Sequence, residues 1–203
     1  HGIVLTASYP AKRMGVKTGM PIWEAKQHCR DLIIVPASYG KYQKYSGYVR
    51  EVFNDYTDQV ESFGLDEAWL DITGSVGLFG SPVKIAKEIS VRIKRELGIT
   101  VSIGVSFNKI TAKLGSDYKK PDAITVIEPD TYKQIVYPLP VGDLLYVGNA
   151  TQRKLGSYGI RTIGQLAETN PEVLKGWFGV MGYTLSAFAR GLDQTPVAKQ
   201  DAH

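Results

Sequence analysis

The spacing of apolar residues predicts two long helices in the first half of the chain. Residues 41–56 carry aromatic and aliphatic side chains three and four positions apart, which indicates an amphipathic helix. Between residues 81 and 97 an apolar side chain recurs every four residues, at Ile85, Ile89, Ile93 and Leu97. Ser81 is placed to cap this second helix, Pro82 to begin it and Gly98 to end it.

Short β-rich segments surround these helices. They cover residues 2–8, 60–63, 68–73, 99–105 and 123–127, with helices expected around residues 22–29 and 108–118. From residue 60 the order is strand, strand, helix, strand, helix, strand, which is typical of an antiparallel or mixed sheet with helices on one face. After about residue 128 the pattern changes to short helical pieces broken by Gly and Pro, so we place a domain boundary there.

The composition is that of a globular protein. Of the 203 residues, 43% are hydrophobic and 22% are charged, which excludes a disordered, collagen-like or coiled-coil chain. Apolar runs stay shorter than the roughly 18 residues of a membrane span. The single cysteine, Cys29, cannot form an internal disulfide or a Cys-rich zinc site, so we predict a cytoplasmic protein with no membrane attachment.

The net charge of +4 is concentrated near the amino end of the chain. Residues 1–30 hold five Lys or Arg residues against Glu24 alone, a balance that suits phosphate or nucleic acid, although a solvated surface gives the same count. The chain begins at His1 directly before an apolar run, and its last ten residues lack a hydrophobic period. We therefore expect both ends to continue in a longer protein.

Two adjacent carboxylates, Asp66 and Glu67, interrupt a strand-forming stretch at residues 63–71. Neighbouring side chains of a strand point to opposite faces, so these two can converge on one ion only at a hairpin tip, and Gly64 allows such a tight turn. Two oxygen donors suit Mg²⁺, which takes one or two carboxylates and completes its octahedron with phosphate and water. A polar turn without a metal is the alternative, because turns favour Asp.

The residues around this pair carry a resemblance to a known family. Residues 64–71, Gly-Leu-Asp-Glu-Ala-Trp-Leu-Asp, resemble the palm motif Ser-Ile-Asp-Glu-Ala-Tyr-Leu-Asp of the Y-family translesion DNA polymerases, in the DNA polymerase IV branch. The resemblance extends over essentially the whole chain. It implies an α+β fold with small α/β fingers (1–37), a mixed or antiparallel palm sheet with helices on one face (38–127), an all-α thumb (128–193) and a linker (194–203) toward a little-finger domain.

The resemblance also assigns residues to the nucleotide. In the family's fingers a Tyr and a basic residue three positions later meet the incoming triphosphate, and these positions are Tyr9 and Lys12. The family usually has Arg followed by Lys, whereas this chain has Lys12 followed by Arg13, and a lysine cannot form the bidentate phosphate fork of arginine. Thr6 matches a third phosphate contact, and Lys120 matches the palm lysine that reaches the triphosphate.

Three other lysines near Lys120 are interpreted as a solvated helix face. They are Lys109, Lys113 and Lys119.

Residues 147–166 resemble a helix-hairpin-helix, the thumb module that grips a DNA backbone without reading its sequence. In this motif a glycine-bearing turn lets backbone N–H groups approach a phosphate at a helix start. The predicted DNA-binding residues are Gly148, Ala150, Thr151 and Lys154. Ala150 replaces the second turn glycine, and its methyl group is expected to hinder the phosphate. A purely structural helical hairpin is the alternative.

The resemblance implies a DNA-directed DNA polymerase that extends a primer past damaged template with deoxynucleoside triphosphates at two Mg²⁺ ions. Asp66 and Glu67 are then both catalytic and metal-binding, with Glu67 near the attacking 3′ oxygen. The family's Asp-x-Asp strand, its aromatic steric gate and its little finger do not occur in this sequence, so we expect the chain alone to be inactive.

The implied partners are primer-template DNA, deoxynucleoside triphosphates and a sliding clamp bound through regions outside the chain, and the protein is expected to be a monomer. Two alternative hypotheses about the function remain. One is a non-catalytic DNA-binding or scaffold protein derived from the same fold. The other is a nucleotide cyclase-like palm enzyme, which the helix-hairpin-helix disfavours.

Overall fold

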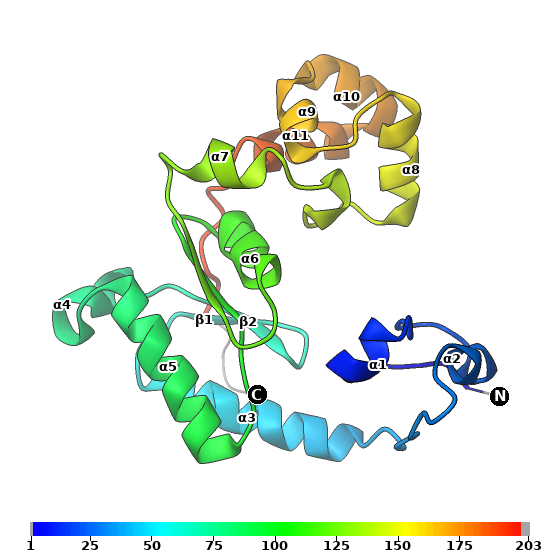
Figure 1. Cartoon of the computed structure of the whole chain (residues 1–203). Helices are drawn as coiled ribbons and strands as arrows, with labels where there is room; N and C mark the ends of the chain where they lie inside the picture. Colours follow the sequence, from blue (N-terminus) through cyan, green and yellow to red (C-terminus); the bar gives the residue numbers. More distant parts are fainter. Residues whose placement is uncertain (1, 200–203) are drawn as a thin grey trace. The chain divides into compact units, whose positions relative to one another are not determined.

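The computed structural model describes residues 2–199, which divide into two compact units. The first unit ends at Gln43 and the second begins at Lys44. Figure 1 shows the helices and strands of both units. The boundary falls inside helix α3 (Tyr39–Asn54), which begins two residues before the predicted helix.

The first unit holds two short helices, α1 (Tyr9–Arg13) and α2 (Ile22–His28). The hydroxyl of Ser8 caps α1 by accepting a hydrogen bond from the backbone N–H of Ala11 at 3.4 Å. The small core of the first unit consists of Val4, Ala11, Val16 and Ala25. The predicted strand at residues 2–8 is wrong, because this segment makes only an isolated bridge, between Ile3 and Pro21, and no extended ladder.

Four strands of the second unit form two separate two-stranded sheets. Strand β1 (Val60–Phe63) pairs antiparallel with β2 (Glu67–Leu70), and Phe63 lies opposite Glu67 across the hairpin. Strand β3 (Ile103–Ser106) pairs parallel with β4 (Ile124–Ile127). The α+β class with both kinds of pairing is confirmed, but the strands do not join into one sheet. Strands β2 and β3 are also shorter than predicted.

Helix α5 (Pro82–Leu97) has the predicted bounds because strong local signals fix both ends. The Ser81 hydroxyl accepts a hydrogen bond from the backbone N–H of Lys84 at 3.3 Å, and Gly98 takes the left-handed conformation that ends many helices. The four-residue repeat buries Ile85, Ile89 and Ile93 in one apolar cluster. Between β2 and α5 the chain forms a 3₁₀ turn, η1 (Thr73–Ser75), and a short helix, α4 (Val76–Phe79).

Helix α6 (Lys109–Tyr118) connects β3 to β4 and packs closely against both strands. Asn108 caps it, because its side-chain oxygen accepts from the backbone N–H of Thr111 at 2.9 Å. The approach to β3 is so close that a Cβ atom added to Gly104 would lie 1.8 Å from the carbonyl oxygen of Ala112. A glycine is therefore needed at this position for α6 to lie where it does.

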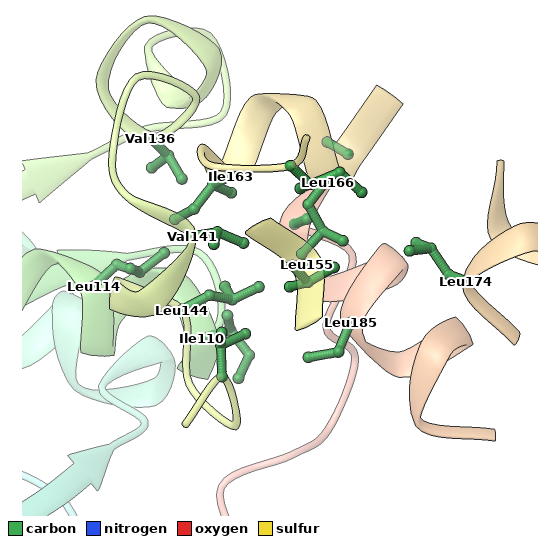
Figure 2. Close-up of a cluster of buried hydrophobic side chains, with 14 of the residues drawn as sticks. Ile110, Leu114, Val136, Val141, Leu144, Leu155, Ile163, Leu166, Leu174 and Leu185 are labelled. Atoms are coloured by element: carbon green, nitrogen blue, oxygen red, sulfur yellow. The ribbon is translucent and has the colours of Figure 1, made fainter. Parts of the chain in front are cut away.

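Between β4 and Ala189 the chain is mostly helical, and these helices share one hydrophobic core with α6. The helices are α7 (Tyr132–Val136), the 3₁₀ turn η2 (Val141–Asp143), α8 (Asn149–Ser157), α9 (Ile163–Glu168), α10 (Pro171–Phe178) and α11 (Val180–Ala189). Figure 2 shows Ile110 and Leu114 of α6 in the same cluster as Leu144 and Leu155. This shared core couples the position of α6 to the helices that follow it.

After α11 the chain returns to strand β1. The backbone N–H of Ala198 donates to the Glu61 carboxylate at 2.7 Å, and Lys199 forms an ion pair with Asp58 at 2.9 Å. Within the predicted linker, residues 198 and 199 therefore form a hydrogen bond and an ion pair with residues at the start of the hairpin. Residues 200–203 of that linker lie outside the described residues.

Within residues 2–199, none of the helices combines the length and the apolar character needed to cross a membrane.

Candidate nucleotide and metal site

The predicted carboxylate pair lies at the turn of the β1–β2 hairpin. Residues 64–66 form the turn, so Asp66 ends it and Glu67 begins β2. Gly64 has a φ of +77°, a conformation that favours glycine, and its carbonyl accepts a hydrogen bond from the Arg50 guanidinium at 3.1 Å. Asp66 is exposed and Glu67 is half-buried. The two carboxylates thus lie at a hairpin turn, the position at which neighbouring side chains can converge on one ion.

A row of four alternating charges runs from this turn along α6. Lys113 Nζ lies 2.8 Å from Glu67 Oε1 and 2.8 Å from Asp117 Oδ2. The other oxygen of Asp117 lies 2.6 Å from Lys120 Nζ. The structure therefore connects the predicted metal carboxylate Glu67 to the predicted triphosphate lysine Lys120 through Lys113 and Asp117.

The two middle groups of this row stabilise each other's charged forms. Burial alone lowers the pKa of Lys113, but its bonds to Asp117 and Glu67 outweigh burial, so this pKa is raised. Burial alone raises the pKa of Asp117, and its bonds to Lys113 and Lys120 outweigh that effect and lower it. Both groups are therefore ionised at neutral pH.

A second lysine of α6 joins the helix to the same hairpin. Lys109 Nζ lies 2.6 Å from Glu61 Oε2 and 4.6 Å from the centre of the Trp69 ring. The Trp69 indole N–H donates to the carbonyl of Lys109 at 3.0 Å. Burial raises the pKa of Glu61, but bonds to Lys109 and to the backbone N–H of Ala198 lower it overall.

The interpretation of Lys109 and Lys113 as a solvated helix face is therefore wrong. Their side chains are only 12% and 16% exposed, because the hairpin covers this side of α6. The usable signal was the four-residue spacing of Lys109, Lys113 and Asp117, which places all three on one stripe of the helix.

The donor set at the hairpin turn fits a divalent cation. Asp66 and Glu67 supply hard carboxylate oxygens, which Mg²⁺ accepts when phosphate and water complete its shell. Across residues 2–199 there is no group of three or more His, Cys, Asp or Glu side chains arranged to hold a metal ion. The chemistry of these two carboxylates therefore suits a divalent cation whose shell other ligands complete.

The predicted nucleotide residues of the first unit lie on or next to α1. Tyr9 begins this helix and Lys12 lies one turn later, with its ammonium 5.1 Å from the centre of the Tyr9 ring. Thr6 precedes the helix, and it is exposed like Tyr9, Lys12 and Arg13. The structure brings Tyr9 and Lys12 together as an exposed aromatic and cationic pair.

The predicted DNA-binding residues lie in the first two turns of α8. Gly148 is its N-cap residue, and among the described residues no side chain caps this end. Ala150 is exposed and Thr151 is half-buried. Lys154 donates to the carbonyl of Trp177 at 2.5 Å, and its ammonium lies 4.8 Å from the centre of the Phe178 ring. The ammonium of Lys154 is thus engaged with α10, a contact that the sequence did not indicate.

Comparisons with known proteins agree over nearly the whole chain. The family model described as the impB/mucB/samB family matches residues 1–117, and the model described as the DNA polymerase-iota thumb domain matches residues 142–193. DNA polymerase IV of Acetivibrio thermocellus is 55% identical over 201 residues, which are 99% of this chain and 50% of that protein. DNA polymerase IV 1 of Bacillus subtilis is 41% identical over 196 residues, 97% of this chain and 47% of that protein.

Solved structures show the same likeness in three dimensions. DinB from Sulfolobus solfataricus matches with a TM-score of 0.88 and 32% identity, over 98% of this chain and 59% of that one. An insertion ternary complex of Dbh DNA polymerase matches with a TM-score of 0.88 and 32% identity, over 97% of this chain and 58% of that one. The chain spans about half the length of the curated relatives that it matches. It belongs to the impB/mucB/samB family, the Y-family DNA polymerases, in the DNA polymerase IV branch.

Proposed function

We propose that the protein containing this chain is a Mg²⁺-dependent, DNA-directed DNA polymerase of the translesion type, which adds deoxynucleotides to a primer 3′ end. The observation that carries the proposal is the hairpin turn that presents Asp66 and Glu67, joined by Lys113 and Asp117 to Lys120. Phosphoryl transfer requires groups that hold metal ions and cations that offset phosphate charge, and this arrangement supplies both. Family membership supports the same activity.

Each predicted residue has a definite role in this proposal. Asp66 and Glu67 hold Mg²⁺, which when bound supplies the charge that neutralises the reacting phosphate. Lys120 binds the triphosphate. Lys12 and Tyr9 bind the triphosphate from the fingers, with a single-point ammonium contact where the family usually places an arginine. Thr6 adds a hydroxyl donor to the same phosphates.

The thumb residues are proposed to bind the backbone of primer-template DNA. The start of α8, which is exposed from Gly148 to Ala150, offers backbone N–H groups to a phosphate, and the helix dipole favours the negative charge there. The Ala150 methyl group limits how closely the phosphate approaches. Lys154 contributes positive charge beside this helix, although its bond to the Trp177 carbonyl restricts its reach.

The proposed organisation keeps the domain division expected from the sequence, with fingers at residues 1–37, palm at 38–127, thumb at 128–193 and a linker from 194. A sliding clamp as a partner, a monomeric state and a cytoplasmic location stay predictions for the full-length protein.

Primer extension by the purified full-length protein tests the proposal. We expect Mg²⁺-dependent extension of a primer by the wild-type protein, loss of extension in Asp66→Asn, and normal extension in Lys87→Met, which neutralises an exposed lysine of α5. Binding to duplex DNA that weakens with salt and ignores nucleotide, without any extension, would instead establish the non-catalytic DNA-binding alternative.

A further inference from the structure

The row Glu67, Lys113, Asp117 and Lys120 alternates in charge and is bonded end to end. Its two outer members are the groups that the proposed function gives to the metal ion and to the triphosphate. Its two inner members, Lys113 and Asp117, have no role in that function. They are nevertheless the members that hold the outer two in place.

Lys113 is held in position by its surroundings. Its side chain is 16% exposed, and its ammonium contacts the carboxylates of two different elements, β2 and α6. One turn earlier on α6, the Trp69 indole N–H donates to the carbonyl of Lys109, which fixes the hairpin against the helix. The packing of the hairpin on α6 therefore places the ammonium of Lys113 beside Glu67.

The pairing pattern changes in a balanced way when a metal–nucleotide complex enters. In the proposed function, a divalent cation binds the Glu67 carboxylate and a triphosphate binds the Lys120 ammonium. Each inner group then loses one partner, and Lys113 and Asp117 remain paired with each other at the i,i+4 spacing of α6. The largely buried ammonium of Lys113 thus keeps a carboxylate partner, which avoids the large cost of an isolated buried charge.

We propose that Lys113 is a positioning residue: it is the internal counter-ion of Glu67, yields this carboxylate to the divalent cation when the metal–nucleotide complex binds, and keeps Asp117 as its remaining partner. This inference rests on the proposed function. It predicts that Lys113 competes with the metal ion in the absence of nucleotide. A lysine that only stabilises the fold would not compete in this way.

Mn²⁺ binding to the full-length protein without nucleotide, followed by electron paramagnetic resonance of free Mn²⁺, tests this competition. We expect Lys113→Met and Lys113→Gln to bind Mn²⁺ about tenfold more tightly than the wild type, because a positive charge beside the ion is removed. Lys113→Arg keeps the charge and is expected to bind like the wild type. Lys87→Met, which neutralises an exposed lysine of α5, is the matched control and should leave the affinity unchanged.

Asp117→Asn gives a prediction of the opposite sign. Without Asp117, Lys113 has Glu67 as its carboxylate partner, so Mn²⁺ affinity is expected to fall several-fold. This variant decides the question if the neutral Lys113 variants do not fold, which circular dichroism reports. Unchanged or tighter Mn²⁺ binding by Asp117→Asn would overturn the proposal.

Primer extension separates this inference from the function on which it rests. We expect Lys113→Met to lower kcat/KM for nucleotide about tenfold and Lys113→Arg to restore it, because a cation then again holds Glu67 in position until the metal–nucleotide complex binds. Wild-type extension together with unchanged Mn²⁺ affinity in Lys113→Met would overturn the role of Lys113 and leave the function standing. Absence of extension by the wild-type protein would overturn both.

Discussion

The close contact between β3 and α6 makes Gly104 the position where a single methyl group has the largest predicted effect. A Cβ atom at residue 104 would lie 1.8 Å from the carbonyl oxygen of Ala112 and 2.6 Å from the backbone nitrogen of Ser116. Ordinary carbon contacts are about 3.5–4.0 Å, so α6 would have to retreat by well over 1 Å. Because the opposing atoms are backbone, no side chain can rotate away to relieve the overlap.

The expected cost of Gly104→Ala is at least about 3 kcal/mol of unfolding free energy, the upper end of the range for overpacked cores. For an m value near 2 kcal/mol per molar, the midpoint of urea unfolding should fall by roughly 1.5 M. Retreat of α6 also moves Lys113 away from Glu67, so Mg²⁺-dependent primer extension by the full-length variant should fall about tenfold at temperatures where it is still folded.

Gly47→Ala is the matched control. Gly47 lies inside α3, where an added Cβ atom meets nothing within 4 Å. Alanine favours helix over glycine, so this variant should gain about 0.5–1 kcal/mol of stability. A Gly104→Ala protein whose urea midpoint equals that of the wild type would refute the reasoning, because it would mean that α6 does not contact β3 as described.

Three further variants test the framework around the site. Tyr132→Phe removes a hydroxyl that donates to carbonyls at the end of α11, so urea unfolding should show a loss of about 1 kcal/mol, and an unchanged midpoint would contradict those bonds. Asn108→Ala removes the α6 cap and a bond to the Gly191 carbonyl, so thermal unfolding should show a loss of about 1–2 kcal/mol, whereas an unchanged Tm would exclude both contacts. The lowered pKa of Asp117 stabilises the fold above the unfolded pKa of about 3.9 and this contribution is lost as pH falls through the folded value, so Asp117→Asn should flatten the acid side of a stability–pH profile. A variant profile as steep as that of the wild type would contradict this.

Local signals explain why some elements were predicted with the correct bounds. Ser81, Pro82 and Gly98 set the two ends of α5 through contacts with residues a few positions away. The bounds of this helix can therefore be predicted from the local sequence alone. The hairpin turn was predictable for the same reason, since Gly64 and the two carboxylates Asp66 and Glu67 fall within four consecutive residues. Residues 2–8 have the apolar pattern of a strand, but a ladder also needs a partner, and Ile3 bridges only Pro21.

The ion pairs of the site depend on contacts that local patterns do not contain. Glu67 and Lys113 are 46 positions apart, and they meet only because the hairpin packs on α6. Charge spacing on α6 showed which residues share a stripe of the helix but not what covers that stripe. Lys154 is a similar case, since its bond to the Trp177 carbonyl comes from a helix 23 positions away. Burial of long charged side chains was thus the property that sequence reasoning predicted least well.

The central claim is that the hairpin carboxylates and Lys120 bind the same metal–nucleotide complex. Acetylation of lysines in the full-length protein, read residue by residue by mass spectrometry, tests it directly. A deoxynucleoside triphosphate with Mg²⁺ should slow acetylation of Lys120 several-fold, leave the exposed Lys87 unaffected, and lose this protection in Asp66→Asn. Equal acetylation of Lys120 with and without nucleotide and Mg²⁺ in the wild-type protein would contradict the account.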